Sequence, residues 1–467
     1  MRAATLDDSN GDRMNILHVA SEVAPLSKTG GLGDVVGALP AALHQQGDQA
    51  CVVSPRYGSV DPGAHGLARR LRTLTVPVGG QTFEVGVFEG RLPDGKAPIY
   101  LLDHPLFSGR QGLYGPPEQP GQDYPDNALR FALLGSGALV LARDFGLQPD
   151  VIHAHDWQGA LALYYAREGI GVAGATPHPV GKVFTIHNLA FQGHVPMDQA
   201  GTLGIAGHDL TPDGVEFYGQ INLLKAGLRA ADRVTTVSPR YAQEIQTAEF
   251  GFGMEGMLQH LGGRLSGILN GADYERWSPW RDPFIPAPYG KPPGQLADLV
   301  DPAAFAAAMA GKARCKAELQ RELGLAVRPQ APLCATITRL TTQKGIDLIL
   351  QVLESEEGWR QGMQYVVVGA GDHGYEARLR ELARRHPGRM AVVIGFNEAL
   401  SHRVEAGADI YIMPSRFEPC GLNQMYSLRY GTPPIVRATG GLADTVVDVS
   451  TDTLDDKTAN GFVLDGD

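Results

Sequence analysis

The chain has 467 residues, which is enough for two or three domains that each bury a full hydrophobic core. Its formal net charge at pH 7 is −11, from 40 Lys and Arg against 51 Asp and Glu, and this excludes a general affinity for nucleic acid or for an anionic membrane surface. The four cysteines show no C-x-x-C spacing, which argues against a disulfide framework or a structural zinc site and favours a reducing, cytoplasmic compartment.

The predicted elements begin after a polar stretch, residues 1–13, which lacks the apolar core of a secretion signal and is expected to be a disordered tail. Short apolar, β-branched runs then alternate with helix-like segments, a pattern typical of α/β proteins. The predicted strands are residues 16–20, 51–54, 151–155, 183–187 and 233–238 in the first half, and 333–338, 365–369, 391–395, 409–414 and 434–437 in the second. We therefore predict two Rossmann-like, doubly wound domains, 14–268 and 269–467, that face each other across a ligand-binding cleft.

The first glycine-rich segment follows the run 16–20 and reads Lys28-Thr-Gly30-Gly31-Leu. Backbone N–H groups at a helix N-terminus attract phosphate, glycines allow a close approach, and Lys28 adds a positive charge. A dinucleotide-binding turn does not fit, because Val36 stands where the third glycine is needed. A Walker-A loop does not fit either, because the lysine precedes the glycines. A glycine turn that only caps a surface helix remains the alternative.

A cationic turn follows the predicted strand 333–338 and reads Arg339-Leu-Thr-Thr-Gln-Lys344-Gly. Arginine binds phosphate oxygens through two N–H groups and lysine adds a compact charge, so the pair can neutralise a diphosphate without a metal ion. Cations in the first turn of a helix oppose the helix dipole, which argues against a purely structural role. The turn therefore predicts a phosphate-binding site.

An acidic loop follows the predicted strand 409–414 and reads Pro414-Ser-Arg-Phe-Glu418-Pro-Cys-Gly. A carboxylate in such a loop commonly orients sugar hydroxyls or stabilises positive charge at an anomeric carbon, although a helix-capping role is the alternative for Glu418. Further along, Gly440 and Gly441 form a second Gly-Gly turn whose amides can bind phosphate.

Histidines lie at the ends of two predicted strands. His153, His155 and Asp156 close one run, and His187 closes the next. His153 and His155 share a strand face, but no third ligand stands at a metal-binding spacing. A core or cleft role is therefore favoured over a metal site for these imidazoles.

Together these segments resemble bacterial glycogen synthases and plant starch synthases, which are retaining glucosyltransferases of the GT-B fold that use ADP-glucose. The resemblance extends from Ile16-Leu-His-Val-Ala-Ser-Glu22 to Thr439-Gly-Gly-Leu-Ala-Asp444. Between these ends it includes Lys28-Thr-Gly-Gly-Leu, Asp126-Asn-Ala-Leu-Arg, His153-Ala-His-Asp-Trp, Phe184-Thr-Ile-His-Asn, Gly219-Gln-Ile-Asn-Leu, Leu269-Asn-Gly, Ser401-His-Arg and Pro414-Ser-Arg-Phe-Glu-Pro-Cys-Gly-Leu.

The resemblance implies a role for each matching residue. Lys28, Gly30 and Gly31 would contact the donor, and Arg339 and Lys344 would bind its diphosphate. The residues that would surround the transferred glucose are Asp156, His187, Asn270 and Glu418. Further donor contacts are implied for Phe396, Cys420, Gly421, Leu422, Asn423, Gly440 and Gly441. Phe396 stands where similar sequences often carry a tyrosine that stacks on adenine, and Asn423 stands where some carry threonine.

The implied reaction is transfer of glucose from ADP-glucose to the non-reducing end of an α-1,4-glucan with retention of configuration, without metal or other cofactor. ADP-glucose and glycogen are then the expected partners, with no nucleic acid and no membrane. Two alternatives remain open: a sucrose- or UDP-sugar-type transferase of the same fold, and a glucan-binding relative without activity. Similar proteins continue past the equivalent of residues 461–465 with helices that cross back to the first domain, and this chain is expected to lack them.

Overall fold

A computed structural model describes residues 13–93, 97–118, 121–170, 180–292 and 301–464. By contacts the chain divides into two compact units, of which the first holds Met1–Thr235 and Leu261–Leu265 and the second holds Thr236–His260 and Ser266–Asp467. Residues 236–260, predicted in the first domain, are thus grouped with the second. The predicted tail 1–13 lies, apart from Arg13, outside the described residues.

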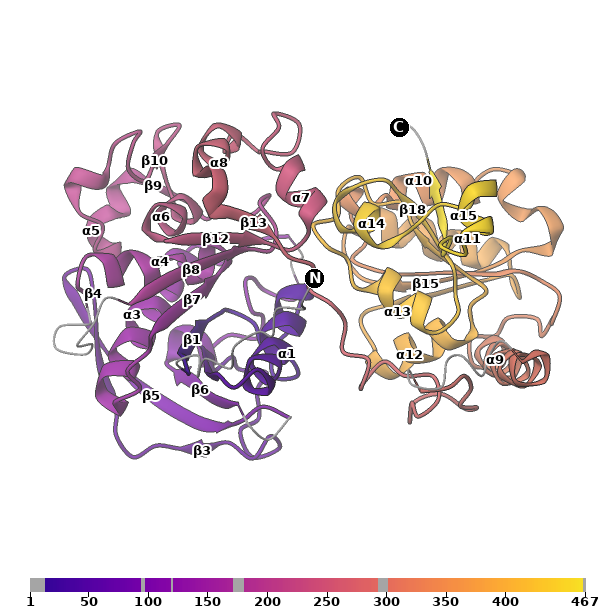
Figure 1. Cartoon of the computed structure of the whole chain (residues 1–467), viewed down its shortest axis with the longest axis horizontal. Helices are drawn as coiled ribbons and strands as arrows, with labels where there is room; N and C mark the ends of the chain where they lie inside the picture. Colours follow the sequence, from indigo (N-terminus) through magenta and orange to yellow (C-terminus); the bar gives the residue numbers. More distant parts are fainter. Residues whose placement is uncertain (1–12, 94–96, 119–120, 171–179, 293–300, 465–467) are drawn as a thin grey trace, which may run out of the picture. The chain divides into compact units, whose positions relative to one another are not determined.

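The larger sheet has ten strands in the order β13-β12-β8-β7-β1-β2-β6-β5-β3, with β4 paired to β5 (Figure 1). Strands β8, β7, β1, β2 and β6 pair in parallel, whereas β5 pairs antiparallel with β6, β3 and β4. The bounds are β1 Asn15–Val19, β2 Gln49–Pro55, β3 Ala68–Arg69, β4 Leu74–Val78, β5 Gln81–Arg91, β6 Pro98–Asp103, β7 Val151–His155, β8 Gly181–Ile186, β12 Arg233–Thr236 and β13 Leu265–Gly267. A separate sheet, β10-β11-β9, contains β9 His194–Pro196, β10 Glu216–Phe217 and β11 Gln220–Asn222.

One helix of the first unit is enclosed by the rest of the unit on nearly all sides. It is α3 (Asn127–Phe145), which is buried around its whole circumference and packs against α4 (Asp156–Arg167). The close approach depends on Gly135, because a Cβ atom there would lie 2.7 Å from the backbone nitrogen of Ala162. The other helices are α1 Gly31–Gln45, α2 Pro105–Ser108, α5 Ala200–Leu203 and α6 Leu223–Ala230, with 3-10 turns η1 Met197–Gln199, η2 Gly207–Asp209 and η3 Gly262–Arg264.

The second unit is built on a six-stranded parallel sheet in the order β16-β15-β14-β17-β18-β19. Two hydrophobic clusters pack around this sheet. Its strands are β14 Leu333–Ile337, β15 Gln364–Gly369, β16 Met390–Ile394, β17 Ile410–Met413, β18 Pro434–Arg437 and β19 Phe462–Leu464. Counted within the unit, this is the Rossmann order 3-2-1-4-5-6, whose direction reverses between β14 and β17.

The remaining helices belong to this unit, except that α8 ends at Leu261, a residue of the first unit. They are α7 Pro239–Glu244, α8 Glu255–Leu261, α9 Pro302–Glu322, α10 Ile346–Leu353, α11 His373–Arg385, α12 Glu398–Gly407, α13 Asn423–Arg429, α14 Gly440–Thr445 and α15 Thr451–Asp455, with the 3-10 turns η5 Thr342–Lys344 and η6 Glu357–Gly362. Helix α7 packs against α14, which accounts for the grouping of residues 236–260 with this unit.

An aromatic stack holds the irregular segment that precedes α9. The indole of Trp277 lies between the rings of His402 and Tyr426, with centroid distances of 3.8 and 4.0 Å. Nδ1 of His402 lies 2.7 Å from the carboxylate of Asp282, which Tyr430 also contacts. Stacking and a buried ion pair therefore attach this segment to α12 and α13.

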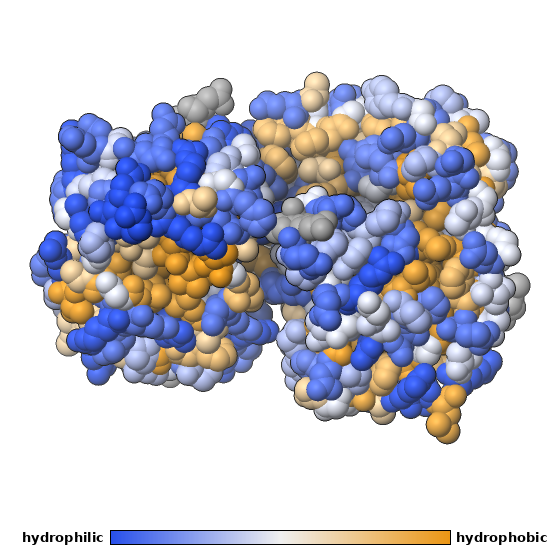
Figure 2. Space-filling view, turned by 180° about the vertical axis from the view of Figure 1, so that it is seen from behind, coloured by the Kyte–Doolittle hydropathy of each residue, from blue (hydrophilic) through white to orange (hydrophobic). Residues whose placement is uncertain are grey.

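Each of the ten predicted strands coincides with an observed one, and the α/β fold with Rossmann-like units is confirmed. Strands β3 to β6, β9 to β11, β13 and β19 were not predicted, and the antiparallel pairing of β5 with β3, β4 and β6 makes the larger sheet mixed. Figure 2 shows hydrophilic residues interspersed with apolar ones over the face in view. Among the described residues, no helix has the length and apolarity required to cross a membrane.

Candidate functional site

The carboxyl edge of the first sheet carries the predicted residues Asp156 and His187. Strands β1, β7 and β8 are parallel neighbours, so the loops that follow them start at the same edge. Oδ1 of Asp156 accepts hydrogen bonds from the backbone N–H of His187 at 2.6 Å and of Asn188 at 3.4 Å. Asp156 has φ +52°, a left-handed conformation that costs energy in a residue with a side chain. Burial raises its pKa to about 7, although the backbone hydrogen bonds oppose this shift.

A row of imidazoles runs from this edge into the core. Nε2 of His187 lies 3.0 Å from Nδ1 of His155, and Nε2 of His155 lies 3.1 Å from Nδ1 of His18. Burial lowers the pKa of His187 to about 3, and it lowers those of His155 and His18 well below the usual value. All three rings are therefore neutral at physiological pH.

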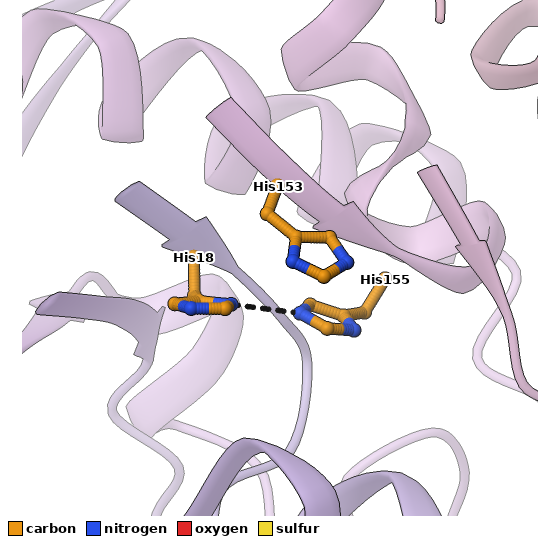
Figure 3. A group of neighbouring side chains, drawn as sticks. All are labelled: His18, His153 and His155. Carbon is orange, nitrogen blue, oxygen red and sulfur yellow. Dashed lines mark hydrogen bonds between the residues drawn. The ribbon is translucent and has the colours of Figure 1, made fainter. Parts of the chain in front are cut away.

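No third ligand stands at a metal-binding spacing from His153 and His155 in the sequence, but strand pairing brings one close, because His18 is the register partner of His153 on the neighbouring strand β1. The ring nitrogens of these three residues lie within 4.8 Å of one another (Figure 3). His153 and His155, however, stack with a centroid distance of 4.3 Å and an interplanar angle of 25°, and Nε2 of His153 contacts the hydroxyl of Thr185 at 2.6 Å. Ligands of one ion must point their in-plane lone pairs at a common point, which stacked rings do not do.

The loop that contains Lys28 is organised by a carboxylate that the sequence analysis did not single out. Glu22 accepts the backbone N–H and the hydroxyl of Thr29, each at 2.6 Å, and the N–H of Gly30 at 3.2 Å. The ammonium of Lys28 lies 2.7 Å from Asp34 in the first turn of α1. Helix α1 begins at Gly31, as the loop pattern indicated, and the backbone N–H of Gly30, an expected phosphate contact, donates to Glu22 in this structure.

The second unit brings Lys344 and Glu418 together at the point where the strand order reverses. The turn after β14 and the loop after β17 are adjacent because these strands pair. Nζ of Lys344 lies 2.5 Å from Oε2 of Glu418, with 14% and 7% of the two side chains exposed. The hydroxyl of Ser415 donates to the same carboxylate oxygen at 3.0 Å. Arg339 starts the cationic turn, and its side chain is exposed.

The second Gly-Gly turn lies beside the same loop. Gly440 has φ +43°, and a Cβ atom there would lie 2.0 Å from the carbonyl oxygen of Glu418. Its N–H donates to both carboxylate oxygens of Glu244 at 3.0 Å, and the N–H of Gly441 donates to the carbonyl of Glu418 at 3.0 Å. Both amides that were expected to meet phosphate therefore have partners within the chain.

The remaining predicted donor contacts differ in their surroundings. The amide of Asn423 donates to the carbonyl of Ile337 at 2.6 Å and to the hydroxyl of Tyr411 at 2.8 Å, so this side chain supports the end of β14. Cys420 is buried, and burial raises the pKa of its thiol to about 12. Phe396 follows β16 and is 69% exposed. Gly421 and Leu422 precede α13, and Asn270 is half-buried in the segment after β13.

Residues 15–260 match the family model described as starch synthase catalytic domain, and residues 324–465 match that of glycosyl transferases group 1. A glycogen synthase of Anaeromyxobacter dehalogenans (strain 2CP-C) is 49% identical over 440 residues, covering 93% of this chain and 86% of that protein. One of Dechloromonas aromatica (strain RCB) is 47% identical over 465 residues, covering 97% and 88%. The catalytic domain of starch synthase IV from Arabidopsis thaliana, bound to ADP and acarbose, matches with 31% identity and a TM-score of 0.84, covering 97% of this chain and 88% of that one.

Proposed function

The chain belongs to the family of glycogen synthases and starch synthases, and from that membership we propose that it transfers glucose from ADP-glucose to the non-reducing end of an α-1,4-glucan with retention of configuration. It is a glycosyltransferase with the GT-B fold. The related starch synthase was solved with ADP and with acarbose, which supports an adenine nucleotide and a glucan-like ligand as the partners of this chain.

The observation that carries the proposal is the ion pair between Lys344 and Glu418 at the strand-order reversal of the second sheet. Ligands of open α/β sheets bind outside the carboxyl ends of the strands at such a reversal. A largely buried ammonium there provides a fixed positive charge for a diphosphate, and the carboxylate beside it can accept hydrogen bonds from sugar hydroxyls. Arg339, exposed at the start of the same turn, adds a second cation.

We propose that the protein accelerates the reaction by electrostatic stabilisation of the transition state. Departure of the nucleoside diphosphate leaves negative charge on its phosphates and an oxocarbenium-like glucosyl group, so Arg339 and Lys344 lower the barrier by neutralising the leaving group. The glucan 4-OH attacks from the same face and gives its proton to the departing phosphate. Glu418, Asn270, Asp156 and His187 orient the glucose.

The loops around the donor have a further part in this proposal. Lys28, Gly30 and Gly31 contact the donor, which requires the Lys28 ammonium to exchange Asp34 for phosphate. The two side chains are 32% and 23% exposed, and surface ion pairs contribute only about 0–1 kcal/mol, so the exchange costs little free energy. The ring of Phe396 stacks on the adenine, and Cys420–Asn423 and the turn Gly440–Gly441 shape the donor pocket. The two cations make a metal ion unnecessary.

Incubation with ADP-[¹⁴C]glucose and glycogen tests the proposal. The expected result is label in polymer that β-amylase releases as maltose, at a rate unaffected by EDTA. In the same assay, Arg339→Ala should incorporate far less label than the native protein. The Arg378→Ala variant is its matched control, because Arg378 is an exposed arginine of the same unit whose partner is Glu354. Absence of label from the polymer, with glycogen still bound, would instead identify a glucan-binding protein without activity.

We propose a cytoplasmic location, in keeping with the four free cysteines.

A further inference from the structure

Three imidazoles form one continuous hydrogen-bonded chain that ends at the proposed glucose site. The chain joins His18 on β1, His155 on β7 and His187 directly after β8, with nitrogen–nitrogen distances of 3.1 and 3.0 Å. Each neutral imidazole carries one N–H and one lone pair, so a ring in the middle that donates through one nitrogen must accept through the other. All three rings therefore carry their proton on the same nitrogen, either on Nδ1 throughout or on Nε2 throughout, and these are the two possible polarities of the chain.

The two possible polarities leave different atoms unpaired. Nε2 of His18 is buried and, within the described part of the chain, has no hydrogen-bond partner. If every proton lay on Nε2, this atom would be a buried N–H without an acceptor. If every proton lies on Nδ1, the same atom is only an unpaired lone pair. Buried N–H groups are orphaned less often than acceptors, so the arrangement with protons on Nδ1 is favoured.

This polarity determines what His187 presents to a ligand. Its Nε2 accepts from Nδ1 of His155, so its proton lies on Nδ1, the ring nitrogen that the chain does not use. Its backbone N–H is held by Asp156 at 2.6 Å, so the ring and the backbone are fixed independently. The ring is thereby a hydrogen-bond donor of defined direction.

We propose that His18 and His155 are positioning residues that hold His187 in its Nδ1–H form, so that it donates a hydrogen bond to an oxygen of the glucosyl donor. The assignment to a substrate oxygen rests on the proposed function, whereas the tautomer itself does not. A donor fixed before the substrate arrives stabilises developing charge without reorganisation during the reaction.

Nitrogen-15 NMR of the full chain, labelled selectively at its 14 histidines, tests the tautomer directly. Loss of one spin system in His187→Gln assigns the resonances of His187. The expected spectrum of the native protein has the His187 proton on Nδ1. A proton on Nε2 would overturn the inference, and this measurement needs neither activity nor any variant of His155.

The His155→Phe variant then tests the positioning role, with His153→Phe as its matched control on the same strand. Both replacements remove a buried or half-buried imidazole, but His153 bonds to Thr185 and takes no part in the chain. We expect His155→Phe to lose the single Nδ1–H form of His187 and to lower kcat by roughly 10- to 100-fold, the usual effect of removing a group that orients another, with little change in the KM for the donor. His153→Phe should retain the native tautomer.

The His155→Gln variant provides a conservative rescue, because its amide can accept from His18 and donate to His187. It should recover part of the lost kcat and the Nδ1–H signal. A His155→Phe protein that keeps both the native tautomer and the native kcat would contradict the positioning role. An inactive native protein with the Nδ1–H form would count against the proposed function and leave the tautomer assignment standing.

Discussion

Replacement of Lys344 by alanine should weaken the fold and slow the reaction, through two effects that can be separated. Its ammonium lies 2.5 Å from Glu418, and only 14% and 7% of the side chains are exposed. Removing one partner of a buried pair leaves the other charge uncompensated, which typically costs about 3–5 kcal/mol. Ser415 still donates to the same oxygen, so a loss of about 3 kcal/mol in unfolding free energy is expected. Loss of the ammonium that neutralises the departing diphosphate should lower kcat roughly 100-fold or more.

Two assays separate these effects. Urea unfolding should show that the double variant Lys344→Ala/Glu418→Gln regains most of the lost stability, because glutamine keeps the hydrogen bond from Ser415 without a buried charge. Turnover at saturating ADP-glucose should remain low in Lys344→Ala at temperatures where it is fully folded. A double variant as unstable as the single one would refute the electrostatic reasoning, and an unchanged kcat in Lys344→Ala would refute the role in catalysis.

Three other predictions concern Arg339, Asp156 and His402. Arg339→Ala should lower kcat roughly 100-fold or more without a loss in melting temperature, because the side chain is exposed; unchanged turnover at saturating donor would reject its role. Asp156→Asn should lower kcat. Burial raises the carboxyl pKa from 3.8 to about 7, so the native protein loses unfolding free energy between pH 4 and 7, and the variant should become increasingly more stable than the native protein over this range and no further above it. A stability difference that does not change with pH would contradict this. Burial lowers the His402 pKa, but hydrogen bonds to Asp282 and Glu398 outweigh this and raise it above 6.5. The stabilisation that protonated His402 gains from these two carboxylates is complete below pH 6.5 and is lost as the pH rises through the folded pKa. The melting temperatures of the native protein and of His402→Phe should therefore converge above pH 6.5.

Buried parallel strands could be predicted because they read as apolar, β-branched runs that end in polar turn residues. The antiparallel strands β4 and β5 were not predicted, because they do not read as continuous apolar runs. Residues of β4 alternate between buried and exposed, and Pro77 near its end argues against a strand. Proline is tolerated there because β4, within the described part of the chain, pairs with β5 alone and is an edge strand.

The chemistry of the site was predictable where it depended on the ends of neighbouring strands. Lys344 and Glu418 come together because β14 and β17 pair, which their place after apolar runs already suggested. The partners of the glycine amides were not predictable, since Glu244 and Gly440 are 196 residues apart in the sequence. His18 was missed for the same reason, because only the register of β1 against β7 places it beside the other imidazoles.

A comparison of sugar donors tests the proposed glucosyl transfer from ADP-glucose. Initial rates of glucose incorporation into glycogen should be measured side by side with ADP-glucose and UDP-glucose, each over a full concentration range. We expect a clearly higher kcat/KM for ADP-glucose. An equal or higher kcat/KM for UDP-glucose would contradict the proposal and identify a UDP-sugar transferase of the same fold.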